Sequence, residues 1–395
     1  MTAAEAEVRE GRFAVWCGWV WTIVAGTLPL LAWAWPLGFQ VVVPAAGVLC
    51  LPALKVERRD GLWITPIALL VGWALLASTW SPYEPPDLEH NTAAKLALQL
   101  PVYLWAVLGA RASDAKGRAR AQAVLGWASL LAALLILIEA VTGAALYQAL
   151  RQAMNDPIRP DLAVRNVAQG VFVLAATGWL GLAGLPRRLA PFAALALAAA
   201  VLVGGLTLRA DAPILALALS AIAAAAVWRF PRGAPTALAV LFGALVLATP
   251  LILGLLDQAG VLEALKGPAP LSWEQRIGYW QVTLAAIGEQ PLTGLGLDGA
   301  RVVMGASLHP HSTSLQLWLE LGAVGAALAA ASWAAILLGL CSPAPRLAAA
   351  LAAAVATAYV VFGAFNFGVW QEWWLALGVF VGAFSALAWR NSPPV

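Results

Sequence analysis

The fold is decided by a stretch of 42 residues without a charge, residues 13–54, which read FAVWCGWVWTIVAGTLPLLAWAWPLGFQVVVPAAGVLCLPAL. A helix that spans a membrane needs roughly 20 mostly apolar residues, and a charge at mid-membrane is costly. The stretch is therefore long enough for two spans. Pro36, Leu37 and Gly38 near its middle are typical of a turn between them.

The rest of the chain has the same character. Of its 395 residues, 62% are hydrophobic and 11% are charged, and the mean hydropathy is +0.82. Because soluble proteins carry about 25% charged residues, this composition excludes a soluble globular enzyme, a disordered chain and a coiled coil. The net charge of +3 does not indicate a nucleic-acid partner. The sequence predicts an all-α polytopic membrane protein, with residues 1–395 forming one integral membrane domain.

Further uncharged gaps locate the other spans. Together with the two helices in residues 13–54 they predict about twelve membrane-spanning helices. One gap is only 15 residues long, and the uncharged residues 91–94 extend it. The gaps are residues 61–83, 96–110, 121–138, 166–186, 189–208, 212–228, 233–256, 321–345, 347–371 and 373–389.

The basic residues predict the orientation. With the N-terminus in the cytoplasm and twelve alternating helices, 15 of the 23 basic residues fall on the cytoplasmic side, as the positive-inside rule requires. Both termini are then cytoplasmic, and two longer loops, about 142–164 and 257–310, lie on the outer face. In the second loop, residues 257–265 have the pattern of a short amphipathic helix. Ser272 is the expected N-cap of a second helix that reaches about Gly288.

Two of the three histidines, His309 and His311, lie together at the outer end of the tenth span. A neutral imidazole can accept or donate a proton near pH 7, which few other side chains do. From His311 the chain continues with Ser312, nine further residues, and then Gly322-Ala323-Val324-Gly325.

This pattern resembles the signature of bacterial O-antigen ligases and their relatives: His, then Asn, Ser or Gln, nine residues, and Gly-x-x-Gly. Upstream, residues 276–280 (RIGYW) and 291–296 (PLTGLG) are similar to the family's arginine, aromatic residue and Pro-Leu-x-Gly-x-Gly. The resemblance is detailed over about residues 271–325. Elsewhere it rests on the number of helices and on the long outer loop before the last three.

The resemblance implies a helical fold of the membrane glycosyltransferase type, active on the periplasmic face of the bacterial inner membrane. The family moves a glycan from undecaprenyl pyrophosphate to a hydroxyl, typically of lipid A–core, without a metal or other cofactor. The implied partners are this lipid-linked glycan, lipid A–core or another glycan acceptor, and membrane lipids, with no nucleic acid. His311 matches the catalytic histidine, and His309, Ser312 and Trp280 are expected to support it.

Arginines that face the pyrophosphate are a second feature that the resemblance implies. Arg209 matches one of them, although Leu208 replaces the small polar residue that usually precedes it. Arg209 also interrupts two apolar runs at an outward turn, where a charge favours a functional role; the alternatives are an ion pair with Asp211 or a membrane-surface anchor. Arg276 and Arg165 are further candidates, with a solvated helix face as the alternative for Arg276. Arginine offers permanently charged, bidentate donors to phosphate oxygens.

Three other patterns carry less weight. Residues 294–299 (GLGLDG) match G-x-G-x-x-G, but no strand precedes them, so we expect no dinucleotide site; a loop whose backbone approaches a phosphate stays open. Residues 87–90 (DLEH) resemble the acidic metal motif of other membrane glycosyltransferases but lie in a proline-rich loop, and we assign no metal. Glu320 lies about half a turn around the helix from His311, so we do not expect the two to pair.

Other functions stay open at this point. A polymerase of O-antigen or exopolysaccharide, or a protein O-glycosyltransferase, shares the same C-terminal motif. O-antigen polymerases are expected to carry two R-x10-G motifs in two outer loops, and the outer loops of this chain contain one match, Arg159 to Gly170. A transporter or lipid flippase is a remote alternative, because internal symmetry and a long central cytoplasmic link are not apparent.

Overall fold

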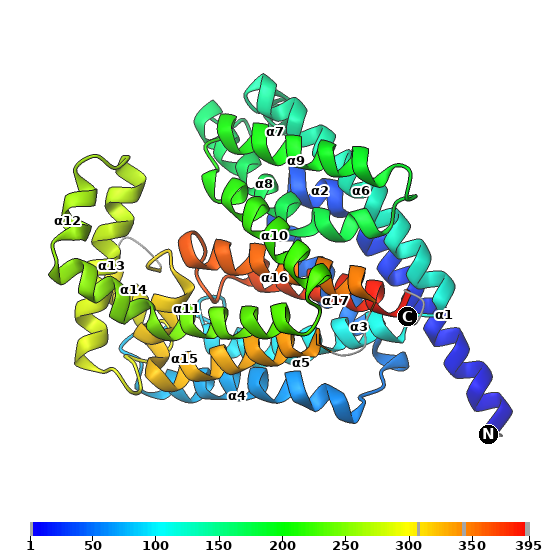
Figure 1. The fold of residues 1–395 in the computed structure, drawn as a ribbon, viewed down its shortest axis with the longest axis horizontal. Coiled ribbons are helices and arrows are strands. Elements are labelled where there is room, and N and C mark those ends of the chain that lie inside the picture. Colours follow the sequence, from blue (N-terminus) through cyan, green and yellow to red (C-terminus); the bar gives the residue numbers. More distant parts are fainter. Residues whose placement is uncertain (1–2, 306–308, 342–344, 392–395) are drawn as a thin grey trace.

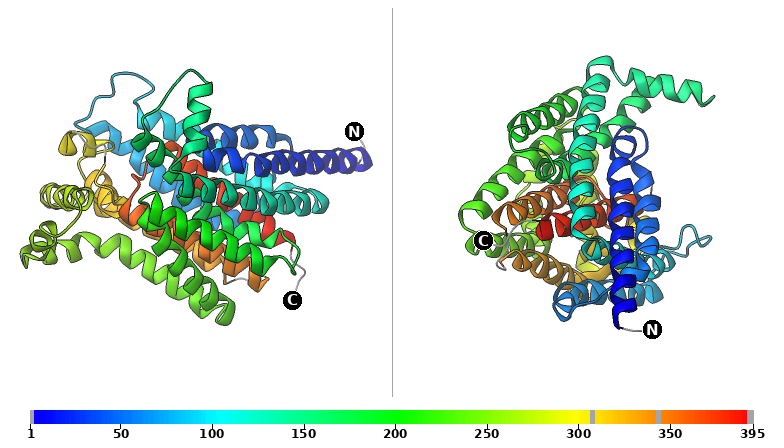
Figure 2. Two further views of the ribbon diagram at one scale, coloured as in Figure 1. Left: turned by 90° about the horizontal axis from the view of Figure 1, so that it is seen from above. Right: turned by 90° about the vertical axis from the view of Figure 1, so that its right-hand side faces the viewer.

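The computed structural model describes residues 3–305, 309–341 and 345–391, and within these ranges all regular structure is helical (Figure 1). Most long helices run side by side as a bundle, and the helices that the long loop forms within residues 261–304 lie beyond one end of it (Figure 2). We call this the loop end. The α-helices are α1 Ala3–Gly26, α2 Leu28–Trp33, α3 Phe39–Leu49, α4 Gly61–Ala77, α5 Thr92–Ala112, α6 Ala115–Thr142, α7 Ala145–Ala153, α8 Pro160–Ala183, α9 Ala190–Thr207, α10 Asp211–Arg229, α11 Gly233–Gln258, α12 Val261–Lys266, α13 Leu271–Glu289, α14 Gly299–Met304, α15 Thr313–Gly339, α16 Arg346–Phe365 and α17 Glu372–Asn391.

The protein is a polytopic membrane protein, but its described residues form eleven full-length candidate spans and not the expected twelve. Among the described residues, eleven helices are long and apolar enough to cross a membrane, and α1 with α2 forms the first of them. The second predicted span is wrong as a full-length helix, because only the short apolar helix Pro36–Leu49 forms there. Proline explains the shortfall: Pro52 lies in a 3-10 turn, Leu51–Ala53, where it donates no main-chain hydrogen bond.

The short helix α3 still brings the chain back along α1. The indole Nε1 of Trp16 donates to the main-chain oxygen of Leu49 at 2.9 Å. The Sγ of Cys17 lies 3.9 Å from the main-chain oxygen of Cys50. Residue 50 therefore lies level with residue 17, near the beginning of the first span.

The weakest predicted span is confirmed as α5, a helix of 21 residues. Asn91 is its N-cap, and the Asn91 side chain accepts a hydrogen bond from Ala94 N at 2.9 Å. Lys95 forms an ion pair with Glu372 at the start of α17. This pair joins α5 to α17 at the loop end.

The most enclosed spans are α8 and α16, which are 72% and 78% buried over their apolar windows. Small residues allow this packing. A Cβ at Gly170 of α8 would lie 2.1 Å from the main-chain oxygen of Ala32 in α2, so only glycine fits there. Because α8 and α16 lie at the centre of the bundle, their ends meet those of α10 and α17 around one cavity at the loop end.

The long loop forms α12, α13 and α14. The amphipathic helix and the longer helix predicted there are present as α12 and α13. The predicted cap is wrong: α13 begins at Leu271, its N-cap residue is Pro270, and no side chain caps it. The main-chain oxygen of Pro270 already accepts from Trp273 N at 2.8 Å and from Glu274 N at 3.0 Å. The extended backbone of Pro270 therefore sets the start of the helix, one residue before Ser272.

Helix α15 is interrupted at Gly322, whose φ of 63° and ψ of −163° are not helical. Loop residues satisfy the carbonyl groups that the break exposes: Leu295 N donates to Leu319 O at 2.8 Å, and Gly296 N donates to Glu320 O at 2.9 Å. The approach is so close that a Cβ at Gly322 would lie 2.3 Å from a main-chain oxygen. Gly322 and the loop of residues 291–296 therefore have a structural role in completing the broken helix.

Candidate active site

Five of the residues singled out in the sequence line one cavity at the loop end, with a volume of about 520 Å³. This volume lies within the range of roughly 300–1,000 Å³ that is usual for small-molecule sites. The five are Arg165 of α8, Arg209 of the α9–α10 turn, Arg276 of α13, and His309 and His311 just before α15. Residues separated by up to 146 positions in the chain thus face one space.

His311 is oriented by a hydrogen bond to the main chain. Its Nδ1 lies 3.0 Å from the main-chain oxygen of Asn366. Because a carbonyl oxygen only accepts, Nδ1 carries the proton and Nε2 keeps its lone pair. The backbone at His311 has a φ of 55°, a conformation that is uncommon outside glycine and that often occurs at functional sites. The ring of Tyr279 stacks against it at a centroid distance of 6.2 Å.

The surroundings of His311 keep it neutral. Burial lowers its pKa, and the positive charges of Arg276 and Arg165 lower it further, against the opposing effect of the hydrogen bond to Asn366. A neutral imidazole with a free Nε2 can accept a proton near pH 7. The site therefore contains a group with the protonation state that a general base needs.

His309 supports the loop that carries His311. Its ring is 8% exposed, and its Nδ1 accepts the main-chain N–H of His311 at 3.1 Å. The proton of the neutral ring is then on Nε2, which lies 3.0 Å from the side-chain amide of Gln371. The atom of Gln371 at this distance is its Nε2, which is also a donor, so the carboxamide is turned over and its oxygen accepts from the ring. Burial and the nearby charges of His311, Arg276 and Arg301 lower the pKa of His309 to about 3, so it stays neutral at ordinary pH.

Arg209 occupies a position at the end of α9 that usually belongs to glycine. Ala210 N donates to Gly205 O at 2.8 Å and Leu208 N donates to Gly204 O at 2.9 Å, which is the pattern of a helix end with one left-handed residue. Arg209 is that residue, with a φ of 58°. A left-handed backbone is less favourable for arginine than for glycine. We therefore look for a function in the side chain of Arg209.

The side chain of Arg209 does not pair with its neighbour Asp211. Within the described parts of the chain, neither Arg209 nor Arg165 forms an ion pair or a side-chain hydrogen bond. Asp211 instead acts on Arg276, and its negative charge partly offsets the burial that lowers the pKa of Arg276. The guanidinium of Arg276 lies 5.1 Å from the ring centre of Trp273. Two unpaired arginines and one partly compensated arginine therefore give the cavity an excess of positive charge.

Two predicted supporting residues lie outside the cavity lining. Ser312 is the N-cap of α15, and its side-chain oxygen accepts from Leu315 N at 3.5 Å. The indole Nε1 of Trp280 donates to the main-chain oxygen of Pro310 at 3.1 Å. Trp280 thus holds the His309–His311 segment through Pro310, and Ser312 caps the helix that follows, so both contacts are structural.

The loop between α16 and α17 contributes cavity residues that the sequence reasoning missed. Asn366, Phe367 and Gln371 lie in this loop, and all three line the cavity. Counting gaps between charges could not find them, because the uncharged gap of residues 347–371 runs through the loop without a break. The cluster of Asn, Gly and Gln within an apolar run is the signal that could have located it.

Glu320 anchors this loop and, as expected, does not contact His311. Its carboxylate is fully buried and accepts from Gln316 Nε2 at 3.1 Å and from the indole of Trp370 at 2.5 Å. The side-chain oxygen of Gln316 in turn accepts from Val369 N at 2.9 Å. The first turns of α15 thus fix the segment that carries Asn366 and Gln371.

The weaker sequence patterns lie elsewhere. Residues 294–299 are not part of the cavity lining, and a Cβ at Gly294 would lie 2.5 Å from the backbone of Glu320. The backbone of this loop therefore approaches the backbone of α15. It does not approach a phosphate in the cavity, which the sequence analysis had left as an alternative. Asp87 and His90 contact each other at 2.7 Å in an exposed loop, and neither lines the cavity.

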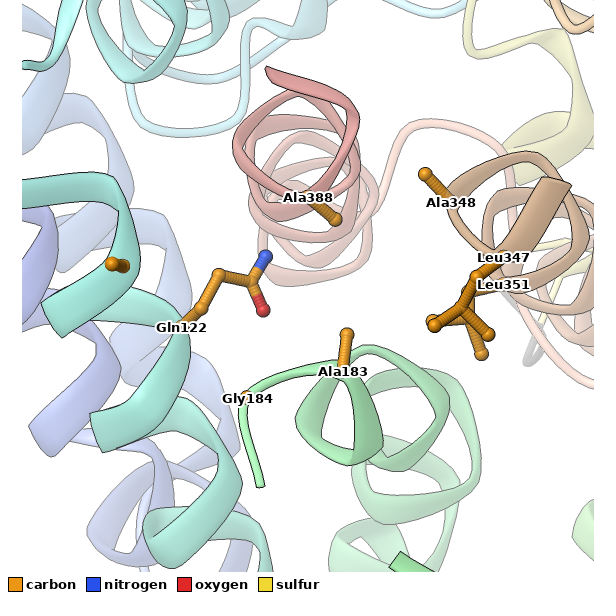
Figure 3. Close-up of a pocket in the computed structure, with 8 residues that line it drawn as sticks. Gln122, Ala183, Gly184, Leu347, Ala348, Leu351 and Ala388 are labelled. Carbon is orange, nitrogen blue, oxygen red and sulfur yellow. The ribbon is translucent and has the colours of Figure 1, made fainter. Parts of the chain in front are cut away.

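A second cavity, of about 220 Å³, lies at the opposite ends of α8, α16 and α17 (Figure 3). The side chain of Gln122 from α6 points toward it, and the remaining lining residues are alanine, leucine and glycine. Because none of its lining residues can be ionised or act as a nucleophile, we assign the chemistry to the first cavity.

Comparisons with known proteins find two similarities. Residues 196–330 match a protein-family model described as "O-Antigen ligase". A Rickettsia conorii protein named "Putative polysaccharide ligase" is 26% identical over 121 residues, which cover 27% of this chain and 29% of that protein. No solved structure matches the chain. The resemblance to the O-antigen ligase family is confirmed over residues 196–330, a segment that includes Arg209, Arg276 and both cavity histidines.

Proposed function

We propose that this protein is an O-antigen ligase-type glycosyltransferase. It moves a glycan from undecaprenyl pyrophosphate to a hydroxyl of lipid A–core, without a metal. The observation that carries the proposal is the cavity itself, where three arginines and a neutral imidazole with a free Nε2 face one space of about 520 Å³. The family match over residues 196–330 supports the class of reaction.

The three arginines suit the leaving group. As the bond between the anomeric carbon and the pyrophosphate oxygen breaks, the bonding electrons and negative charge pass to that oxygen. Arg165, Arg209 and Arg276 offer fixed, permanently charged donors, which stabilise charge as it develops. The donor needs no nucleotide, because it arrives already activated by its pyrophosphate.

His311 suits the acceptor. The acceptor oxygen forms the new bond to the anomeric carbon. Its proton passes to Nε2 of His311, or Nε2 accepts a hydrogen bond from the hydroxyl group and orients it. The carbonyl of Asn366 holds the opposite edge of the ring, so Nε2 is the nitrogen that is free to act. Burial and the neighbouring arginines lower the pKa of His311 and keep this nitrogen unprotonated.

The basic ends of the helices support an outward-facing cavity. Helix α8 carries Arg165 near its start and is followed by Arg187 and Arg188, and α16 begins at Arg346 and ends at the cavity. Under the positive-inside rule the basic ends face the cytoplasm. The cavity then opens at the periplasmic face of the inner membrane, and both termini are cytoplasmic if α3 with its flanking turns completes a twelfth crossing.

The test is transfer by the purified protein. Undecaprenyl-pyrophosphate glycan and lipid A–core are incubated with the wild type and with Arg209→Ala, in the presence of a chelator. Arg159→Ala is the matched control, because Arg159 is exposed and already paired with Asp161. We expect a glycan–core product that Arg209→Ala abolishes and Arg159→Ala preserves. A ladder of lengthened glycan on the lipid carrier would identify a polymerase instead, and no product with any acceptor would refute the proposal.

A further inference from the structure

One continuous segment, residues 365–373, builds a whole wall of the cavity. It contributes the rings of Phe365, Phe367 and Trp373 and the carboxamides of Asn366 and Gln371. None of these five side chains is charged. The arginines come from other elements, so the cavity has a cationic wall from α8, the α9–α10 turn and α13, and a neutral aromatic and amide wall from the α16–α17 connection.

The wall formed by residues 365–373, which we call the amide wall, has side-chain atoms that form no hydrogen bond. Within the described residues, the side-chain oxygen of Asn366 is buried without a hydrogen-bond partner, and so is one amide atom of Gln371. Once Gln371 presents its oxygen to His309, the atom left over is its nitrogen. Both residues line the cavity, so a ligand there can pair with these atoms once the carboxamides turn toward it, and buried polar groups in proteins are usually paired.

The chemistry of this wall fits a sugar ring. A carboxamide both donates and accepts, as a sugar hydroxyl does, and aromatic faces offer apolar surface for the C–H side of the ring. The position fits as well, because the main-chain oxygen of Asn366 holds Nδ1 of His311 at 3.0 Å. A sugar bound to the Asn366 side chain therefore lies beside the proposed base.

We propose that residues 365–373 form the subsite for the acceptor sugar, with Asn366 binding its hydroxyl groups. This inference rests on the proposed function and assigns the second substrate to this uncharged wall. Glu320 supports the subsite indirectly, because its hydrogen bonds with Gln316 and Trp370 fix the segment that carries Asn366. Pyrophosphate and acceptor thus bind to walls of different chemistry in one cavity.

The test measures binding of two probes separately, with the full-length protein in nanodiscs. One probe is undecaprenyl pyrophosphate without a glycan, and the other is the deacylated oligosaccharide of lipid A–core. Asn366→Ala keeps the main-chain carbonyl that holds His311 and removes only the carboxamide. We expect it to weaken oligosaccharide binding roughly 10-fold, the effect of one or two lost hydrogen bonds, and to leave lipid binding within about twofold.

Gln169→Ala is the matched control, because Gln169 is a carboxamide that lines the same cavity from α8. It is expected to leave oligosaccharide binding as in the wild type, whereas Arg209→Ala is expected to weaken the lipid probe alone. Unchanged oligosaccharide binding by Asn366→Ala, or no binding by the wild type, would overturn the subsite. Loss of both probes in Asn366→Ala would also overturn it.

A third probe separates the two sources of sugar. If Asn366→Ala weakens binding of glycan-bearing undecaprenyl pyrophosphate more than of the bare lipid and spares the oligosaccharide, the wall binds the donor glycan and the acceptor assignment is wrong. Failure of the proposed function gives a different result: the wild type then does not bind undecaprenyl pyrophosphate, whatever the result for Asn366.

Discussion

Nδ1 of His311 and the main-chain oxygen of Asn366 lie 3.0 Å apart, across 55 residues of sequence. The contact assigns the proton of the neutral ring to Nδ1 and leaves the lone pair on Nε2. It joins the segment before α15 to the loop before α17. The orientation of the proposed base therefore depends on a loop that carries no charged residue of its own.

The first prediction concerns the pH dependence of transfer. Burial and the charges of Arg276 and Arg165 lower the pKa of His311 from its ordinary value of 6.5. His311 acts as a base only when neutral, so the rate should stay constant above 6.5 and fall only as the pH drops through the lowered pKa. The rate at saturating donor, measured against pH, checks this.

Arg276→Gln removes one of the charges that lower the pKa of His311. The fall in rate at low pH, which is the acid limb of the pH profile, should therefore move to higher pH. Arg301→Gln is the control, because Arg301 lowers the pKa of His309 and has no such effect on His311. An acid limb that stays in place in Arg276→Gln would contradict the electrostatic assignment.

The second prediction separates the two histidines. His309 is neutral at working pH because its pKa is about 3, and its ring holds His311 N and Gln371. His309→Gln should lower kcat by roughly 10- to 100-fold, the size of effect known for residues that orient the ligands of a metal, and should leave the position of the acid limb unchanged. If the acid limb disappears in this variant, His309 itself is the titrating group.

The third prediction tests the break in α15. A methyl group at Gly322 would lie 2.3 Å from the Leu292 oxygen, and the φ of 63° disfavours any side chain. Gly322→Ala should lower the free energy of unfolding by about 3 kcal/mol or more. Gly339→Ala in the same helix meets nothing within 4 Å and should cause no loss. Unfolding in detergent compares the two, and equal stabilities would show that the loop does not pack as described.

The fourth prediction concerns the anchor of the amide wall. Trp370→Phe removes the indole N–H and leaves one oxygen of the buried Glu320 carboxylate without its donor. The expected loss of unfolding free energy is about 1–3 kcal/mol, together with a lower kcat at unchanged KM for the donor. Trp228→Phe, whose ring is 51% exposed, is the control. A variant as stable and active as the wild type would show that Glu320 does not position the loop.

The sequence predicts the features that depend on local composition. Apolar length locates eleven spans, and the pattern from His311 to Gly325 locates one element of the site. The second span is shorter than expected because prolines limit its helical length, which a count of charges does not register. Ser272 has the right residue type for a cap, but the backbone of Pro270 decides where α13 begins.

Most of the cavity could not be predicted, because its walls meet only in the folded protein. Arg165 and Arg276 are 111 residues apart, and no local pattern indicates that both face His311. Asn366 and Gln371 were missed for another reason: uncharged amides between two apolar runs look like part of a span when only charges are counted.

The central claim is that the arginines hold the lipid pyrophosphate and His311 serves the acceptor. The most direct measurement is a single-turnover transfer combined with donor binding, for wild type, Arg209→Ala and His311→Ala. We predict that Arg209→Ala loses donor affinity, whereas His311→Ala binds the donor normally and transfers roughly 10²- to 10⁴-fold more slowly. Transfer by His311→Ala at the wild-type rate, with intact donor binding, would contradict the account.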